Sequence, residues 1–148
     1  MTATTWVAVY GAIVATLSLG WHIYRHLSDK GRLTVNCSVK QLLLGREPDP
    51  CAHVLVWKVV NVGRKPVWLG SFGGGFKDGD NFWLESHGTL PRELKPGESH
   101  SEYLDSLEKL AGELDTLWVD DATDRRYRAR HSQVRQVNED LRTLQRAK

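Results

Sequence analysis

The first pattern along the chain is a long apolar run. Residues 6–24 are nineteen consecutive positions without a formal charge, in a chain whose mean hydropathy is −0.41. At a rise of about 1.5 Å per residue, a helix of this length covers close to the roughly 30 Å hydrocarbon thickness of a bilayer. The run therefore predicts one transmembrane helix, and residues 1–30 are expected to form the anchor and its juxtamembrane turn.

Aromatic rings stand near both ends of this run. Trp6 and Tyr10 lie toward its start and Trp21 and Tyr24 toward its end, where amphipathic rings settle at the level of the lipid headgroups. A secretory signal peptide would have a basic leading region, a shorter apolar run and a small-residue cleavage site. The run lacks these features, so we interpret it as an uncleaved anchor.

Basic residues follow the run and do not precede it. Arg25, Lys30 and Arg32 come after it, partly offset by Asp29, whereas only the α-amino group is charged before it. Lys and Arg close to a span bias that side toward the cytoplasm. The sequence therefore predicts a single-pass protein of the inner (cytoplasmic) membrane, with its N-terminus out and its C-terminal domain in the cytoplasm.

Small residues recur along one side of the predicted helix. They are Ala8, Gly11, Ala12, Ala15, Thr16 and Gly20. Small residues at four-residue spacing let two helix backbones approach closely, so the pattern predicts self-association in the membrane. The alternative is that Ala and Gly are simply common in single spans.

After the anchor the hydrophobic period changes to two. Leu33, Val35, Cys37 and Val39 alternate with polar residues, which is typical of a half-buried strand. Residues 52–62 are apolar on both faces and predict the central strand of a sheet.

Turn-forming residues separate the strands that follow. Gly63 and Pro66 predict a turn at residues 61–66, which is expected to close a hairpin between residues 52–62 and 67–72. Further short strands are expected at residues 82–86, 100–104, 117–119 and 126–129.

Short strands at close intervals suggest a β-sandwich, because each sheet must cover its apolar face with another. The predicted fold is therefore mainly β, with an Ig-like β-sandwich over residues 31–130. Within it, the leucine spacing of residues 107–114 predicts a short inserted helix capped by Ser106. Residues 73–81, which begin with three glycines, are expected to form a flexible connection, because the segment matches neither a phosphate-binding loop nor an EF-hand.

The last segment, residues 131–148, carries Val134, Val137, Leu141 and Leu144 at spacings of three, four and three. This spacing predicts an amphipathic C-terminal helix. The helix is too short for an independent coiled coil. Its apolar face is expected either to dock on its own β-sandwich or to pair with another copy or a partner.

The final predicted hairpin carries an outward row of arginines. Tyr127 and Ala129 are expected to face in, and Arg126, Arg128 and Arg130 to face out. Such a row can contact a partner or anionic lipid, the latter at about 1 kcal/mol per charge. The alternative is that nearby aspartates neutralise it and leave a solvated, salt-bridged edge.

Charge and cysteine content narrow the possible partners. The formal net charge of +2 and the pI of about 8.6 are too mild to indicate nucleic-acid binding. Cys37 and Cys51 are the two cysteines. A cytoplasmic domain keeps them reduced, whereas an extracytoplasmic one would allow a disulfide between them. Without a CxxC motif or paired histidines, no metal site is predicted.

The sequence contains no catalytic constellation. Its six histidines have no HExxH spacing, and no serine lies in a GxSxG motif. The nearest approach to an acid–base pair is His87 or His100 with Glu85 or Glu98. We therefore expect no enzyme activity, no cofactor and no small-molecule substrate.

Four stretches of the chain together resemble a known group of proteins. They are WHIYRHLSDKGRL at 21–33, VVNVGRKPVWL at 59–69, LPRELKPGES at 90–99 and LWVDDATDRRYRAR at 117–130. In these stretches the chain is similar to small, functionally uncharacterised bacterial and phage-associated proteins with one N-terminal span and a compact β-sandwich. The resemblance implies the fold and membrane anchoring, and it carries over no catalytic residue.

Three functions remain open from the sequence. The first is a membrane-anchored protein-interaction module that contacts lipid and self-associates through its transmembrane helix or recruits a protein partner. The second is a membrane-disrupting or pore-forming effector in antiviral defence or phage competition. The third is an extracytoplasmic sandwich displayed on the cell surface, with the opposite topology.

Overall fold

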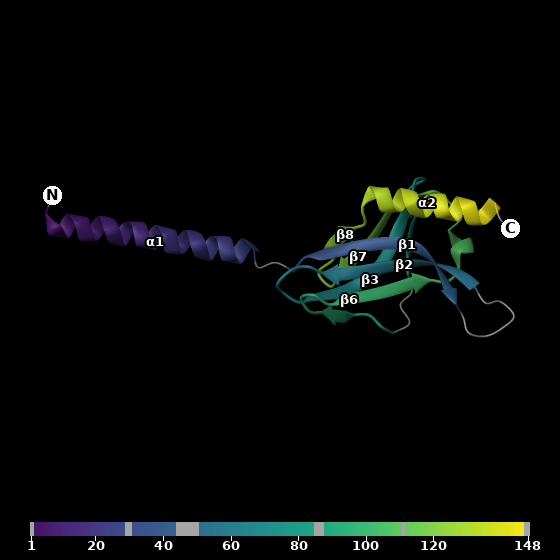
Figure 1. Cartoon of the computed structure of the whole chain (residues 1–148), viewed down its shortest axis with the longest axis horizontal. Helices are drawn as coiled ribbons and strands as arrows, with labels where there is room; N and C mark the ends of the chain where they lie inside the picture. The colour runs from purple at the N-terminus through teal and green to yellow at the C-terminus, as the bar shows by residue number, and fades with distance from the viewer. Residues whose placement is uncertain (1, 29–30, 44–50, 85–87, 111, 147–148) are drawn as a thin grey trace. The chain divides into compact units, whose positions relative to one another are not determined.

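The chain was analysed as a computed structural model that describes residues 2–28, 31–43, 51–84, 88–110 and 112–146. It divides into two compact units, Met1–Lys30 and Gly31–Lys148 (Figure 1). The structure is mixed, with 34% helix and 41% strand, and the expectation of a mainly β chain was too narrow. Two helices of 26 and 16 residues account for the difference.

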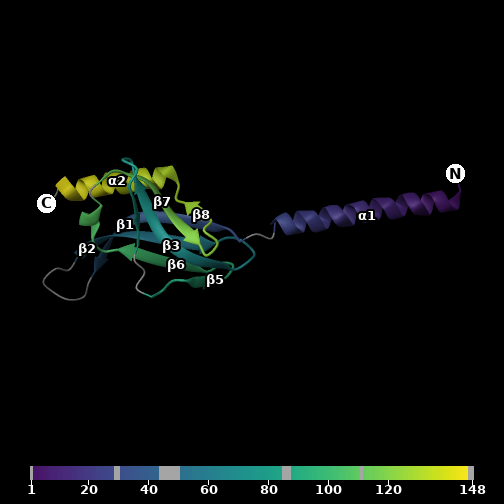
Figure 2. The same ribbon diagram turned by 180° about the vertical axis from the view of Figure 1, so that it is seen from behind.

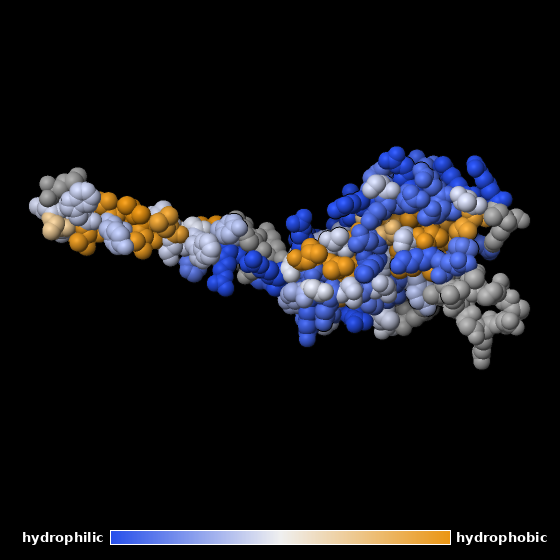
Figure 3. Space-filling model, in the orientation of Figure 1, coloured by the Kyte–Doolittle hydropathy of each residue, from blue (hydrophilic) through white to orange (hydrophobic). Residues whose placement is uncertain are grey.

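The first unit contains the helix α1, Ala3–Ser28. Its stretch Ala3–Arg25 is long and apolar enough to cross a membrane, with a mean hydropathy of 1.4. Figure 3 shows hydrophobic and neutral side chains along most of its surface. The predicted apolar helix is thus confirmed, and it begins three residues before the uncharged run.

The second unit, which we call the body, contains two antiparallel sheets. The first sheet has the strand order β1-β2-β6. Its strands are β1 (Leu33–Leu43), β2 (Cys51–Asn61) and β6 (Ser99–Leu104). The apolar segment that predicted a central strand is therefore central, because β2 pairs with β1 on one side and with β6 on the other.

The second sheet has the order β4-β3-β7-β8, with β5 also paired to β3. Its strands are β3 (Val67–Phe76), β4 (Asn81–Trp83), β5 (Arg92–Leu94), β7 (Leu114–Asp121) and β8 (Arg126–Arg128). The predicted final hairpin is present as β7 and β8. Figure 2 shows this sheet from behind, with β3 and β8 in view.

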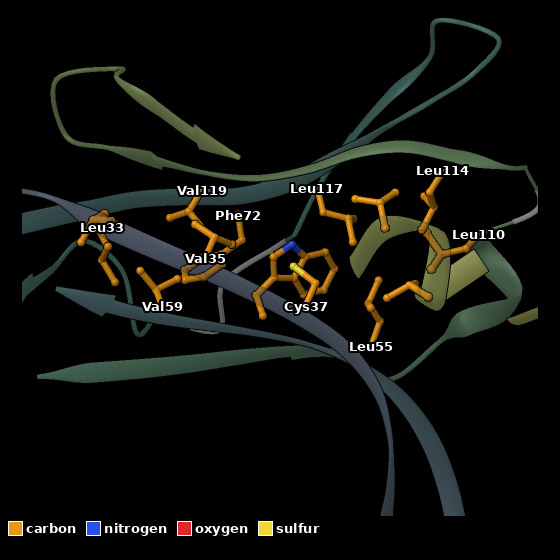
Figure 4. Close-up of a cluster of buried hydrophobic side chains, with 14 of the residues drawn as sticks. Leu33, Val35, Cys37, Leu55, Val59, Phe72, Leu110, Leu114, Leu117 and Val119 are labelled. Carbon is orange, nitrogen blue, oxygen red and sulfur yellow. The ribbon is translucent and has the colours of Figure 1, made fainter. Parts of the chain in front are cut away.

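The inward faces of the two sheets share one hydrophobic core. Leu55 and Val59 of β2 point toward Leu117 and Val119 of β7 in Figure 4. Trp57 of β2 is fully buried in the same cluster. Burial of such side chains stabilises the body by roughly 1.5–3 kcal/mol each.

The segment between β2 and β3 does not close a hairpin, contrary to the prediction. β2 belongs to the first sheet and β3 to the second, so residues 61–66 cross between the sheets. The buried side chain of Asn61 holds this turn. Its Nδ2 donates to the carbonyls of Lys65 and Leu94, both at 2.8 Å, and its Oδ1 accepts from the Gly63 N–H at 2.9 Å. The hydrogen bond to Leu94 of β5, 33 residues later in the sequence, attaches this turn to the second sheet.

The glycines at 73–75 lie within β3 and do not form the predicted flexible connection. All three are buried and pair with β4 and β7. A β-carbon at Gly74 would lie 2.5 Å from the ring of Phe82 and 2.8 Å from Leu117. Glycine is required because neighbouring side chains fill the space that its own side chain would occupy.

The predicted inserted helix is reduced to a single 3₁₀ turn, η1, at Leu107–Lys109. The side chain of Ser106 makes no capping hydrogen bond there. Leu110 and Leu114 are buried in the core, but Leu114 already belongs to β7. The helical leucine spacing thus reflects burial from a short turn followed by a strand.

The C-terminal helix α2, His131–Arg146, belongs to the same compact unit as the sheets. It packs against β1 and β7. Asn138 fastens it to the start of β7. Its Nδ2 donates to the Leu114 carbonyl at 2.8 Å, and its Oδ1 accepts from the Leu114 N–H at 3.0 Å. The body therefore extends beyond the predicted limit at residue 130.

Candidate functional site

Ala8, Ala12, Thr16 and Gly20 recur every four residues along α1, and Gly11 with Ala15 forms a second row beside them. Ala8 and Gly20 are separated by about 18 Å along the helix axis. The hydroxyl of Thr16 donates to the carbonyl of Ala12 at 2.8 Å, so its hydrogen bond is satisfied within the helix. A β-carbon at Gly11 would meet nothing within 4 Å. This side of α1, formed by the two rows, is an open surface of low relief.

The predicted interface rings of α1 are all exposed. Trp6, Tyr10, Trp21 and Tyr24 have between 64% and 71% of their surface accessible. About 27 Å of helix separates Trp6 from Tyr24, close to the hydrocarbon thickness of a bilayer. Within the described chain no residue of Ala3–Arg25 is buried. The length, composition and exposed rings of α1 are thus compatible with a membrane-spanning helix.

A second candidate surface is the outer face of the sheet that contains β3 and β7. The register aligns Trp83 of β4, Gly73 of β3, Trp118 of β7 and Arg128 of β8 in one line across four strands. We call these four residues the tryptophan–arginine row. Trp83 is 60% exposed, whereas Trp118 is 1% exposed.

Trp118 is buried although it does not belong to the core. A β-carbon at Gly73 would lie 3.1 Å from its indole ring, so the indole lies over bare backbone. The ring of Trp83 meets it edge-on at a centroid distance of 6.5 Å. The guanidinium of Arg126 covers its face, 4.0 Å from the ring centroid, as a cation–π contact.

A carboxylate holds Arg126 over this ring. Its Nε donates to Asp120 Oδ1 at 2.8 Å and its Nη2 to Asp120 Oδ2 at 2.9 Å. These hydrogen bonds to Asp120 raise the pKa of the Arg126 guanidinium above its ordinary value. Such a two-point pair fixes the planar group in position. The side chains beside Trp83, namely Trp118 and Arg126, are thus already held in place in the unbound protein.

The outward arginines are divided by these contacts. Tyr127 and Ala129 pack against the core, as predicted, while Arg126, Arg128 and Arg130 are exposed. Asp120 neutralises Arg126, as the salt-bridged alternative predicted. Arg128 and Arg130 form no ion pair with any residue that the structure describes. Of these three arginines, Arg128 and Arg130 therefore keep a charge that is available to a partner.

The apolar face of α2 is occupied by its own body. Val134, Val137 and Leu141 are buried there, and Leu144 is half-buried. Of the two alternatives for this helix, docking on its own domain is the one that the structure shows. These four residues do not offer a free surface for a partner helix.

His100 lies beside a carboxylate, but not the one expected. Its Nε2 is 2.9 Å from Glu102 Oε1, and Glu102 also accepts a short hydrogen bond from the Thr89 hydroxyl. His87 and Glu85 lie outside the described residues. The His100 ring packs against Phe72 of the core at a centroid distance of 6.1 Å. The His100–Glu102 pair therefore lies where β6 of the first sheet meets β3 of the second, and its contacts contribute to packing there.

The two cysteines are far apart in the register of β1 and β2. Cys37 pairs with Trp57, whereas Cys51 pairs with Leu43, so about six residues or roughly 20 Å of strand separate them. A disulfide needs α-carbons within about 7 Å. The disulfide expected of a surface-displayed domain is thus incompatible with this fold. Cys37 is a free, buried thiol, and burial raises its pKa to about 12.

Metal ligation has little support in the described parts of the chain. No group of three or more His, Cys, Asp or Glu side chains is placed there to hold an ion.

Comparison with known proteins adds little. No protein-family model matches the chain, and no curated protein matches it. A solved structure described as "X-ray structure of Northeast Structural Genomics Consortium target SoR45" is similar over 70% of this chain and 83% of that chain, with 11% identity and a TM-score of 0.28. That similarity is too low to carry an argument about fold or function.

Sequence reasoning missed the tryptophan–arginine row. Trp83 and Trp118 had been assigned to strands, but their facing was not considered. The signal was present, because Trp118 stands between Leu117 and Val119, two residues that a period of two points inward. The pairing with Gly73, which decides how deeply the indole lies, depends on a register that the sequence does not reveal.

Proposed function

We propose that this protein is a membrane-anchored protein-interaction module. In this proposal α1 spans the inner (cytoplasmic) membrane with its N-terminus outside, and the body lies in the cytoplasm. The small-residue side of α1 brings copies together in lipid, and the tryptophan–arginine row of the body binds a protein partner. The charge bias after the helix supports the orientation, and the apolar length of α1 supports the anchoring.

The observation that carries the interaction is the construction of this row. Interface centres that contribute most binding energy are enriched in Trp and Arg. Here Trp83 is 60% exposed, beside a Trp118 indole that Arg126 and Asp120 hold in place. A surface fixed in advance loses little conformational entropy on binding. Beyond its edge-on contact with Trp118, most of the Trp83 surface remains accessible to a partner.

The strand order supports an Ig-like β-sandwich as the fold of the body. In that fold one sheet carries strands A, B, E and D, and the other carries C, F and G, with C′ added in variable-type domains. The orders β1-β2-β6 and β4-β3-β7-β8 correspond to A-B-E and C′-C-F-G in chain order, whereas β5, which takes the place of strand D, departs from the pattern because it pairs with β3. Because one fold hosts many functions, this correspondence supports the architecture and does not select the partner.

Crosslinking in native membranes tests the row. The double variant Trp83→Ser with Arg128→Ser should lose a crosslinked partner that the unaltered chain retains, because both exposed members of the row are removed. Tyr103→Ser is the matched control, since Tyr103 is 56% exposed on β6 of the other sheet. Equal crosslinking of all three chains would contradict the proposed surface.

The oligomeric state of the full chain in detergent tests the small-residue side of α1. Gly11→Leu and Ala12→Leu add bulk to that side and should convert an oligomer to a monomer. Leu17→Trp also adds bulk, but on the side of the helix away from Gly11 and Ala12, and should leave the oligomer intact. A monomer in every case would remove self-association from the proposal. A closed ring would instead favour the membrane-disrupting effector.

A further inference from the structure

The end of the body that receives the chain from α1 has a distinctive surface. α1 ends at Ser28 and β1 begins at Leu33. A chain of five residues reaches at most about 18 Å, whatever its conformation. If α1 spans the bilayer, the start of β1 must therefore lie within that distance of the helix end. Anything displayed beside Leu33 lies close to the lipid headgroups.

The turn at residues 61–66 lies beside this point, and we call it the junction turn. The Arg32 carbonyl accepts hydrogen bonds from the N–H groups of Val62, at 2.8 Å, and Gly63, at 3.1 Å. Leu33 pairs with Asn61 in the β1–β2 ladder. The residue that precedes β1 is thus bonded directly to the junction turn, so the turn shares its distance limit from the membrane.

The junction turn is held rigidly from within and exposes its outer side chains. The buried Asn61 side chain bonds to Lys65, Leu94 and Gly63, as described above. Val62 is 55% exposed, and both basic side chains of the turn are exposed as well. Two residues after the turn, Trp68 is 51% exposed. An exposed valine and tryptophan at this end are unexpected for a surface that meets only water.

The charge of this corner is net positive. Residues 31–34 and 61–67 contain Arg32, Arg64 and Lys65 and no acidic residue. In the adjacent turn the formal charges of Lys95 and Glu98 cancel, and Glu98 Oε2 accepts the backbone N–H of Lys95 at 3.0 Å. Glu93, which pairs with Trp68, follows the oppositely charged Arg92. The formal local excess is therefore three positive charges beside exposed apolar side chains. Cytoplasmic bilayer surfaces are negative, and tryptophan settles at the headgroup level.

We infer that the junction turn is a lipid-docking surface, in which Arg64 and Lys65 contact anionic headgroups while Val62 enters the boundary between headgroups and acyl chains. This inference rests on the anchoring of α1 proposed above. It differs from the lipid contact expected at Arg126, Arg128 and Arg130, of which Arg126 is already paired with Asp120. Docking at this corner limits the tilt of the body and leaves the tryptophan–arginine row to a protein partner.

The test uses the full chain with Cys51→Ser, reconstituted in vesicles of phosphatidylcholine alone or with phosphatidylserine. A fluorophore is placed at Val62→Cys, and quenching by headgroup-attached nitroxide lipid is measured. Cys37 is buried and stays unlabelled. Lys40→Cys provides the matched site, because Lys40 is exposed on the same strand about 23 Å beyond Leu33. The label at 62 should be quenched more than the label at 40, most in phosphatidylserine vesicles and less at high salt.

Removing single positive charges from the junction turn provides a second measurement. Arg64→Gln and Lys65→Gln should each lower the ratio of docked to undocked body about fivefold, which corresponds to one basic residue at an anionic surface. Arg135→Gln, on the exposed side of α2, should leave the ratio unchanged. Melting temperatures should match, since Asn61 and the backbone hold the turn. Equal quenching at positions 62 and 40 in chains that float with the vesicles overturns lipid docking alone. Chains that do not float overturn the anchor, and the docking with it.

Discussion

The two helices of this chain differ in whether the described chain covers their apolar side chains. α1 is apolar over most of its surface and has no residue of Ala3–Arg25 buried within the described chain, whereas α2 is apolar on one side, and that side is buried on β1 and β7. A helix of 16 residues is marginal in water without tertiary contacts, and α2 obtains them from its own body. Apolar content alone therefore does not show where a helix is covered, whereas the distribution of polar residues around the helix does.

A charge on the buried side of α2 should have the largest effect on the body. Val137→Asp should lower the free energy of unfolding of the body by more than about 4 kcal/mol, because Val137 is 0% exposed and the carboxylate would have no partner. Urea unfolding in detergent measures this loss. Arg135→Asp, on the exposed side, should change the same quantity by less than about 0.5 kcal/mol. A stable Val137→Asp body would show that α2 is not essential to the core.

A charge in α1 should have the reverse effect. Ile13→Arg places a guanidinium near the middle of the span, at a cost to insertion of about 3 kcal/mol. The fraction of chain that floats with membranes should fall, while the urea midpoint of the body stays unchanged. Ile13→Leu keeps the apolar surface and should float as the unaltered chain does. Loss of body stability in Ile13→Arg would mean that α1 packs on the body after all.

The polar fastening of α2 gives a smaller effect. Asn138→Ala leaves the N–H and carbonyl of Leu114 without their buried partners and should destabilise the body by about 2 kcal/mol. Urea unfolding again gives the value, and Glu139→Ala on the exposed side is the control. Amide exchange should also quicken at Leu114. If it does not, another group satisfies the start of β7.

The smallest expected effect concerns the β7–β8 turn and depends on pH. Burial alone would raise the pKa of the Asp121 carboxyl, but hydrogen bonds from Thr123, Arg125 and Tyr127 outweigh it and hold that pKa below its ordinary value of 3.8. The charged carboxyl therefore stabilises the body fully above pH 3.8, and this contribution is lost as the pH falls through the lower pKa of the folded state.

Asp121→Asn should accordingly be less stable than the unaltered chain by about 1 kcal/mol at neutral pH. The difference should shrink as the pH is lowered below 3.8. Thermal unfolding across that range measures it, with Asp124→Asn as the control, since Asp124 is exposed. A difference that does not change with pH would assign the role of Asp121 to shape and not to charge.

Local patterns predicted the elements well where one physical signal dominated. The uncharged run gave α1, the alternation from Leu33 gave β1, and the spacing of Val134 and Val137 gave α2. In each case the period of apolar residues reflects the face that must leave water, and a single sequence contains that period in full.

The failures share a different cause, because they depend on partners distant in the sequence. Gly73 was assigned to a flexible connection, yet the space that a side chain would occupy there is taken by the ring of Trp118, 45 residues later in the sequence. A turn was correctly expected at residues 61–66, but Gly63 has no positive φ there, and Asn61 bonds to Leu94 of the other sheet. The candidate site shows the same contrast. The helix α1 and its aromatic rings were predicted from local sequence, whereas predicting the tryptophan–arginine row would have required the register of four strands.

The attachment of the anchor to β1 has a mechanical consequence. β1 is an eleven-residue strand bonded to β2 along its whole length, and its first residue is the one nearest the span. Tension that reaches the body along the chain from α1 therefore enters it at Leu33, which pairs with Asn61. The first hydrogen bonds to bear that load are those at the start of the β1–β2 ladder and the two that the Arg32 carbonyl accepts from Val62 and Gly63.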